Sequence, residues 1–334
     1  MESNNAIRIE SPGGMDFRDY LERSLRDPFS LDLSGLSLSE VIRACKRTKS
    51  KMRPNYAKTL VCLEHNLDIL QEQYKITLQP IQITDIFWTY FIDFCTRRGL
   101  RKSTILTLCN QLRAVLNWAA KYNATVSPTY GDVRIGNPVN NEIALTADEV
   151  SRITYFDVDG YFNDRRKDYR DIMIRVRDMF VLSCNLFQRH SDMVRITPEC
   201  FDRNIFKIVQ QKTGNLAIVD IDRFSIEPKT TYRILKKYGY EAPYKADIGN
   251  FNRHLHELIR AVGLDEQVRI EERGADGRMR SESLPKWALV SSHTARRTAI
   301  TINVKRGKNV HDLRKCSGHT DLRIFDNYVR DNYT

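Results

Sequence analysis

A short segment near the C-terminal end of the chain combines residue types that can act together on phosphorus. His293-Thr294-Ala295-Arg296 is followed by Gly318-His319 and then, nine residues after His319, by Tyr328. A phenol is a weak nucleophile at neutral pH because its ordinary pKa is about 10. Fixed cations beside it stabilise both the phenolate and an anionic transition state. A tyrosine that shares a segment with imidazoles and a guanidinium therefore predicts nucleophilic attack on a phosphate ester.

The order of these residues resembles that of a known family. Ser292 to Arg297, then Gly318-His319, then Tyr328 is similar to the C-terminal signature of tyrosine recombinases, the phage-integrase family. In that family a His-x-x-Arg precedes a Gly-His or Gly-Trp, and the nucleophilic tyrosine follows at the same interval. A second His-x-x-Arg, from His311 to Arg314, lies outside this ordered set, and we interpret it as a solvated helix or loop surface.

The family's first arginine box has a counterpart earlier in the chain. Gln188-Arg189-His190-Ser191-Asp192 directly follows a long apolar segment, 171–186, which predicts a buried helix. The resemblance makes Arg189 the first catalytic arginine and Asp192 an acidic residue that braces the site.

A lysine candidate lies between the two arginine motifs. The β-like runs 206–211 and 216–221 flank Lys212-Thr213-Gly214-Asn215, and this pattern predicts a hairpin with a glycine turn. In the family a lysine sits on such a hairpin, and Lys212 matches it. Lys207, one strand earlier, is the competing assignment.

The resemblance implies a role for each member of the set. The expected catalytic residues are Arg189, Lys212, His293, Arg296, His319 and Tyr328. Tyr328 attacks the phosphodiester and leaves a 3′-phosphotyrosyl link and a free 5′-hydroxyl, with Tyr333 as the nearest alternative nucleophile. The arginines hold the non-bridging oxygens, the histidines bind the phosphate and handle the tyrosine proton, and Lys212 protonates the leaving oxygen. We expect neither a metal nor ATP, because arginines supply the charge clamp and the phosphotyrosyl bond conserves energy.

The overall charge indicates a polyanionic partner. The 334 residues carry a formal net charge of +11, with a pI near 9.3, which favours DNA or RNA. Seven cysteines are scattered without a Cys-x-x-Cys pair, which argues against a disulfide scaffold or zinc ribbon and for a reducing compartment. The polar start and the lack of a long apolar run predict neither a signal peptide nor a membrane span. We therefore expect a cytoplasmic protein, associated with the nucleoid when bound to DNA.

Hydrophobic periodicity predicts a mainly α fold (α+β). Helices are expected at 37–46, 55–73, 84–97, 103–121, 228–238 and 247–262, and a hairpin or mobile loop at 266–284. Ser37 and Glu40 have the spacing of a capping box, and Thr146 is the expected cap of a helix that starts after the linker.

The chain is long enough for two domains. We expect a loosely ordered tail at 1–35, a helical DNA-binding domain at 36–123, a Pro- and Gly-containing linker at 124–144, and a catalytic domain at 145–334. This layout resembles the family's core-binding (SAM-like) domain and its mostly helical catalytic domain with a small antiparallel sheet. In the family the two form a C-shaped clamp around DNA.

A basic run near the first helix suggests phosphate contacts. The candidate DNA-binding residues are Arg43, Lys46, Arg47, Lys49, Lys51 and Arg53. Such runs are also common on solvated surfaces that bind nothing.

The resemblance implies a site-specific recombinase of a mobile element that acts on double-stranded DNA as a homotetramer, with accessory DNA-bending or directionality factors. Pro285-Lys286-Trp287 also looks like integrases of the Bacteroidetes type. A type IB topoisomerase and a non-catalytic DNA-binding protein are the alternatives. Two departures from the family pattern are Ser317, where leucine is usual and packing would change, and the short segment after Tyr328, from which we expect different or weak subunit coupling.

Overall fold

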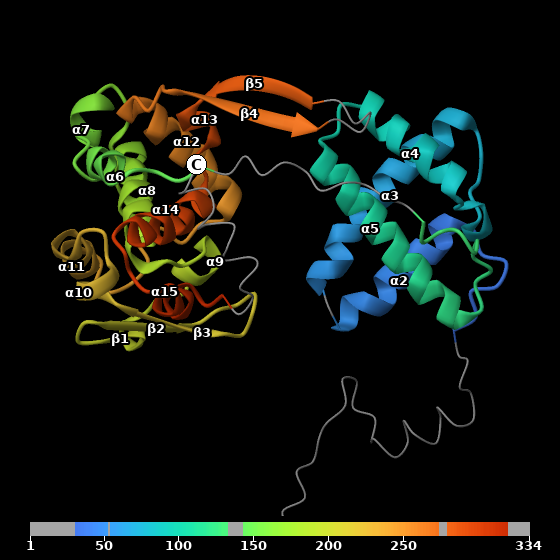
Figure 1. The fold of residues 1–334 in the computed structure, drawn as a ribbon, viewed down its shortest axis with the longest axis horizontal. Helices are drawn as coiled ribbons and strands as arrows, with labels where there is room; N and C mark the ends of the chain where they lie inside the picture. The colour runs from blue at the N-terminus through green and yellow to red at the C-terminus, as the bar shows by residue number, and fades with distance from the viewer. Residues whose placement is uncertain (1–30, 53, 133–142, 274–278, 320–334) are drawn as a thin grey trace, which may run out of the picture. The chain divides into compact units, whose positions relative to one another are not determined.

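The computed structural model describes residues 31–52, 54–132, 143–273 and 279–319. This part of the chain is mainly α-helical with two small antiparallel sheets, which confirms the predicted fold class (Figure 1). The chain divides into two compact units, residues 1–139 with 272–280 and residues 140–271 with 281–334. Among the described residues no helix is both long enough and apolar enough to cross a membrane.

The first unit is a helical bundle. Its elements are α2 (Leu38–Met52), α3 (Pro54–Tyr74), η1 (Pro80–Gln82), α4 (Asp85–Arg97), α5 (Lys102–Ala119) and η2 (Ala120–Tyr122). The predicted helix limits differ from these by at most six residues, and the largest difference is at the end of α2. The capping box before α2 is confirmed, because the backbone N–H of Ser37 donates to Glu40 Oε2 at 2.8 Å and the N–H of Glu40 donates to Ser37 Oγ at 3.4 Å.

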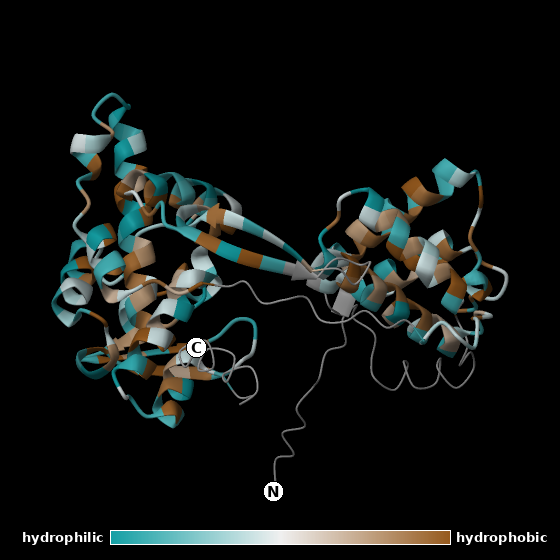
Figure 2. Cartoon of the chain, turned by 45° about the horizontal axis from the view of Figure 1, so that its top comes forward, coloured by the Kyte–Doolittle hydropathy of each residue, from teal (hydrophilic) through white to brown (hydrophobic). Residues whose placement is uncertain are grey.

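The packed part of this unit extends beyond residues 36–123. Leu33, expected in the tail, is 1% exposed, and its backbone N–H donates to the carbonyl of Tyr122 at 2.9 Å. At the other end, Trp88 Nε1 donates to the carbonyl of Tyr130 at 3.1 Å, and Ser127 is buried. Both ends therefore belong to the helical core. Figure 2 shows hydrophobic and hydrophilic residues alternating along these helices, as amphipathic packing requires.

The second unit combines helices with the three-stranded sheet and most of the two-stranded sheet. Its helical elements are α6 (Ala147–Thr154), α7 (Val158–Tyr161), α8 (Lys167–Leu186), α9 (His190–Met193), η3 (Pro198–Cys200), α10 (Ile221–Phe224), α11 (Pro228–Lys237), α12 (Ile248–Val262), α13 (Lys286–Leu289), α14 (Ser292–Lys305) and α15 (Val310–Ser317). Helix α8 is central: it packs against α6, α11, α12 and α14, and Met179, Phe180 and Leu182 are fully buried on it. The predicted Thr146 cap is confirmed, since its Oγ1 accepts from Glu149 N at 3.2 Å.

Two hairpins carry the strands of this unit. In the three-stranded sheet, β1 (Phe201–Asp202), β2 (Ile205–Val209) and β3 (Leu216–Asp220) pair antiparallel in that order. Phe206 faces Val219 and Ile208 faces Ala217 on the buried side, while Lys207 lies opposite Ile218 on the outer side. Helix α15 packs against β3 (Figure 1). The second sheet pairs β4 (Gln267–Arg273) with β5 (Met279–Pro285), so the region predicted as a hairpin or loop contains a hairpin's two strands.

Candidate active site

The end of α8 adopts a backbone conformation that turns the chain toward the candidate site. Phe187 caps the helix in the left-handed region, with φ of 62°, and its side chain is fully buried. A non-glycine residue there costs about 1–3 kcal/mol and persists only when its surroundings enforce it. Arg296 Nη1 donates to the Phe187 carbonyl at 3.0 Å. The second candidate arginine thus holds the turn that leads directly to Gln188-Arg189, the first arginine box.

Arg296 lies on the first turns of α14, one helical turn after His293. A capping box starts this helix, because Ser291 N donates to Thr294 Oγ1 at 2.9 Å. The spacing of three residues places His293 and Arg296 on the same helix face. Arg296 is 0% exposed and His293 is half-buried. A fully buried guanidinium requires fixed partners, since an uncompensated charge in the interior is strongly destabilising.

His319 is one of those partners. Arg296 Nη2 lies 3.0 Å from His319 Nε2 and 3.3 Å from Nδ1. Because a guanidinium only donates, the imidazole nitrogen that it contacts must carry a lone pair. Ser317 Oγ lies 2.9 Å from His319 Nδ1 and donates to the Leu313 carbonyl at 2.8 Å. Because the Ser317 hydroxyl donates to Leu313, it can accept from Nδ1–H, and we infer a neutral ring with its proton on Nδ1 whose nearer nitrogen, Nε2, accepts from Arg296.

The surroundings of His319 favour this neutral ring. Burial, followed by the positive charges of Arg296, Arg189, His293 and Arg314 in that order, lowers the pKa of His319 from 6.5 to about 3. The same causes group Arg189, Arg296 and His293 around the neutral His319 in one electropositive site. Such a site stabilises added negative charge, as on a phosphate in its transition state.

Arg189 joins this site through the three-stranded sheet. It caps α9, is half-buried, and its Nη1 donates to Gln210 Oε1 at 3.0 Å. Gln210 directly follows β2 and is 1% exposed. Its Nε2 donates to the carbonyl of Ser317 at 2.9 Å, two residues before His319. The arginine box, the hairpin and the end of α15 therefore meet at a single side chain.

Asp192 holds the hairpin turn that carries Lys212. Its side chain is fully buried, Oδ1 accepts from the backbone N–H of Gln211 at 2.7 Å, and Arg195 Nη1 lies 3.7 Å from the same oxygen. Lys212 is exposed in the turn, where Gly214 has a φ of 69°. Lys207 is also exposed but lies on β2 itself. The hydrogen bond from Gln211 fixes the turn beside Lys212, and the choice of Lys212 over Lys207 stays a prediction.

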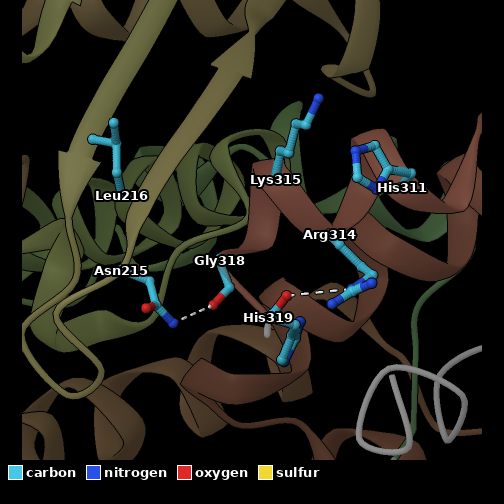
Figure 3. A pocket seen from close by; sticks show the side chains of 7 residues that line it. All are labelled: Asn215, Leu216, His311, Arg314, Lys315, Gly318 and His319. Carbon is cyan, nitrogen blue, oxygen red and sulfur yellow. Dashed lines mark hydrogen bonds between the residues drawn. The ribbon is translucent and has the colours of Figure 1, made fainter. Parts of the chain in front are cut away.

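A pocket of about 300 Å³ opens beside His319 between β3 and α15. Its lining residues, drawn in Figure 3, are Asn215, Leu216, His311, Arg314, Lys315, Gly318 and His319. Asn215 Nδ2 donates to the Gly318 carbonyl at 3.1 Å, and Arg314 Nε donates to the His319 carbonyl at 3.4 Å. The interpretation of His311 to Arg314 as an ordinary solvated surface is therefore wrong for Arg314, which is half-buried against His319. Only His311, which is exposed, fits that interpretation.

The remaining predicted residues either fall outside the part of the chain that the structure describes or belong to the first unit. Tyr328 and Tyr333 are outside the described residues, as are the side chains of Lys51 and Arg53. On α2, Arg43 Nε lies 3.4 Å from Glu64 Oε1 and Lys46 Nζ lies 2.8 Å from Glu64 Oε2. Arg47 is exposed and Lys49 is half-buried.

The Pro285-Lys286-Trp287 segment is held within the second unit by ion pairs and a backbone hydrogen bond. Lys286 is 9% exposed and pairs with Glu149 Oε1 at 2.6 Å and with Glu266 Oε2 at 3.3 Å. Trp287 N donates to the Leu264 carbonyl at 3.0 Å. In residues 31–52, 54–132, 143–273 and 279–319, no three His, Cys, Asp or Glu side chains gather in a way that could hold a metal ion.

The sequence analysis identified the charged residues of this site but missed the neutral ones. Gln188, Gln210 and Ser317 are all buried and connect the charged groups. The only local signal was their adjacency: Gln188 precedes Arg189, Gln210 lies two residues before Lys212, and Ser317 lies two residues before His319.

Comparisons with known proteins identify the fold. No protein-family profile and no curated protein sequence matches this chain. A lambda integrase fragment, solved as a dimer bound to a COC′ core site, has a TM-score of 0.64 and 16% identity over 89% of this chain and 96% of that chain. A lambda integrase tetramer bound to a Holliday junction has a TM-score of 0.63 and 15% identity over 91% and 80%.

A Tn1549 transposon integrase fragment in complex with a circular intermediate DNA has a TM-score of 0.60 and 15% identity, and the match covers 87% of this chain and 94% of that chain. The likeness to both integrases spans elements of both compact units. The chain therefore has the integrase fold that the resemblance of its motifs to the tyrosine recombinase family predicted.

Proposed function

We propose that this protein is a site-specific tyrosine recombinase that cleaves and rejoins DNA, acting in the integration or excision of a mobile element. The observation that carries the proposal is the convergence of Arg189, Arg296 and a neutral His319 on one buried electropositive site. The integrase fold and the formal charge of +11 support a DNA substrate.

The proposed reaction is a transesterification. The hydroxyl oxygen of Tyr328 forms a bond to the scissile phosphorus while the bond from phosphorus to the 5′-oxygen breaks. Arg189 and Arg296 stabilise the charge on the non-bridging oxygens, and Lys212 donates a proton to the leaving oxygen. His293 and His319 bind the phosphate, and the tyrosine proton passes to His293, because a pKa of about 3 makes His319 too weak a base. The 5′-hydroxyl of another strand reverses the step, which completes strand exchange with no net loss of phosphodiester bonds.

The proposed partners are inferred from the similarity to lambda integrase. The structures of lambda integrase include a dimer on a core site and a tetramer on a Holliday junction. We propose that this chain also assembles as a homotetramer on paired double-stranded sites, with accessory factors that bend DNA or set direction. The basic residues Arg43, Lys46 and Arg47 would contribute phosphate contacts in the first unit.

A nicked suicide duplex tests the proposal. Duplexes from the flanks of the mobile element should give a covalent protein–DNA adduct on a denaturing gel, lost in Tyr328→Phe and retained in Tyr333→Phe. Arg296→Lys should slow adduct formation by about 100-fold, since lysine cannot reproduce the planar fork. An adduct that survives Tyr328→Phe would move the nucleophile, and tight binding without any adduct would favour a DNA-binding protein. Strand exchange between two duplexes separates a recombinase from a type IB topoisomerase.

A further inference from the structure

A buried glutamine connects three parts of the candidate active site. Gln210 Oε1 accepts from Arg189 Nη1 at 3.0 Å and from Thr213 Oγ1 at 3.1 Å. Gln210 Nε2 donates to Gln188 Oε1 at 2.8 Å and to the Ser317 carbonyl at 2.9 Å. A primary amide has two donor hydrogens and two acceptor lone pairs, so all four capacities are used. The orientation of the amide is determined, because Arg189 only donates and the Ser317 carbonyl only accepts.

We propose that Gln210 is a positioning residue that fixes Arg189, the turn that carries Lys212, and the segment that carries His319 relative to one another. Its catalytic consequence rests on the proposed recombinase function. Its structural part rests on the hydrogen bonds alone. Gln210 contacts no substrate in this proposal and acts only through its neighbours.

A second glutamine, Gln188, also binds the end of α15. Gln188 Nε2 donates to the Leu186 carbonyl at 2.7 Å and to the Cys316 carbonyl at 2.9 Å. Two glutamines from separate elements therefore bind two successive carbonyls, those of Cys316 and Ser317. These are among the last carbonyls of α15, which have no partner within the helix. The capping of α15 is thus supplied by the arginine box and the hairpin.

Gly318 shows how closely these elements approach. It ends α15 in the left-handed region with φ of 65°, and a Cβ at this position would lie 2.6 Å from Gln210 Oε1. Real Cβ atoms essentially never approach other atoms so closely. The Gly-His sequence therefore has a local explanation, because only glycine allows Gln210 to reach the Ser317 carbonyl. His319 follows immediately, so its position depends on this contact.

The neutral amide suits the chemistry proposed for Arg189. It orients the guanidinium without cancelling its charge, so the charge remains available to a phosphate. A carboxylate in the same place would compete with the phosphate and would face the Ser317 carbonyl, which offers no proton. Misplacement of a catalytic group by about 1 Å can slow a reaction by about 100-fold.

The test combines catalysis with hydrogen exchange. Gln210→Met keeps the side-chain length and removes all four hydrogen bonds. Gln71→Met is the matched control, because the Gln71 amide also donates and accepts hydrogen bonds within the protein. It donates to Ser39 Oγ and accepts from Leu78 N, but it lies in the first unit. The measurements are the Kd for the nicked duplex, the rate of adduct formation on saturated duplex, and the amide exchange rates of residues 210–215 and 313–319.

Gln210→Met should leave the Kd within about twofold and slow adduct formation by about 100-fold. Amide exchange should accelerate in both segments together. Gln71→Met should change neither the rate of adduct formation nor the exchange rates of these two segments. A duplex with a sulfur in place of the 5′-bridging oxygen has a leaving group that needs no proton. It should recover part of the lost rate if the Lys212 turn has been displaced. Gln210→Asn, which keeps the amide on a shorter side chain, should be intermediate and serves if the methionine variant does not fold.

The outcomes separate the two proposals. An unchanged adduct rate, or faster exchange in only one of the two segments, would overturn the positioning role of Gln210. If the wild-type protein forms no adduct, the proposed function fails, and the exchange measurement still decides whether Gln210 couples the hairpin to α15.

Discussion

The hydroxyl of Ser317 lies 2.9 Å from Nδ1 of His319, across the left-handed turn at Gly318. Ser317 is fully buried, and it stands where leucine is usual in the family that the motifs resemble. The sequence analysis expected this departure to alter packing only. That expectation is incomplete, because the serine binds the same imidazole that Arg296 contacts. A second partner of this kind sets the tautomer and the ring orientation of a functional histidine.

Replacing Ser317 should therefore affect chemistry more than folding. Ser317→Ala removes the acceptor for Nδ1–H, and we expect adduct formation to slow by about tenfold, the lower end of the effect of losing a supporting hydrogen bond in metal sites. The ¹⁵N spectrum of labelled histidine should show a mixture of tautomers for His319. Ser183→Ala is the control, since Ser183 is also a buried helical serine, bonded to the Met179 carbonyl at 2.7 Å. Equal adduct rates in wild type and Ser317→Ala would contradict this prediction.

Gly318 should tolerate no side chain while Gln210 is present. Gly318→Ala requires a left-handed alanine and a displaced Gln210 amide, and the backbone strain alone costs about 1–3 kcal/mol. Urea denaturation measures the loss in the free energy of unfolding. In the double variant with Gln210→Ala, the steric part should disappear, which gives a coupling energy of about 1–2 kcal/mol. Strictly additive effects would mean that the two residues do not meet as described.

His319 should make stability depend on pH in a defined direction. Burial, followed by the charges of Arg296, Arg189, His293 and Arg314, lowers its pKa from 6.5 to about 3. Between these two values the unfolded chain takes up a proton that the folded protein does not. The stability is therefore complete above about pH 6.5 and falls as pH decreases, by up to about 1.4 kcal/mol per pH unit.

The measurement is the free energy of unfolding of the wild type and of His319→Gln between pH 6.5 and 5. The variant should lose less stability as pH falls, and the difference in slope should be up to about 1.4 kcal/mol per pH unit, the value for one proton. His190 and His254 also have lowered pKa values because of burial, and they contribute equally to both proteins. Parallel pH profiles would show that His319 is accessible and protonates normally.

If the α2 surface contacts phosphate, the carboxylate of Glu64 in the wild-type protein should weaken DNA binding, because it competes with phosphate for the cations on α2. It pairs with both Arg43 and Lys46, so Glu64→Gln releases two cations. We expect tighter binding and a steeper salt dependence, by up to about 0.9 in the slope of log K against log salt for each added phosphate contact. Asp93→Asn removes the same charge from the Arg97 pair on α4 and is the control. Equal effects of the two variants would indicate a general charge effect rather than contacts at α2.

The sequence by itself predicted the long helices before residue 263 and supplied the charged candidate residues. Helix limits came within a few residues because periodicity and caps such as Ser37 with Glu40 and Thr146 with Glu149 are local properties of the chain. The order of the arginine and histidine motifs was enough to select Arg189, Arg296 and His319. Strand β1 was missed, since two residues carry no periodic signal.

Only the tertiary structure decided how these residues are connected. The bond from Gln210 to Ser317 spans 107 residues, and that from Gln188 to Cys316 spans 128. No local pattern encodes a partner at such a distance, because hydrogen bonding of a neutral amide depends on which elements pack together. The same holds for Phe187, whose left-handed backbone is compensated by Arg296 from another helix. Charged motifs indicate which residues are candidates for catalysis, whereas the buried polar contacts that hold them appear only when the chain is folded.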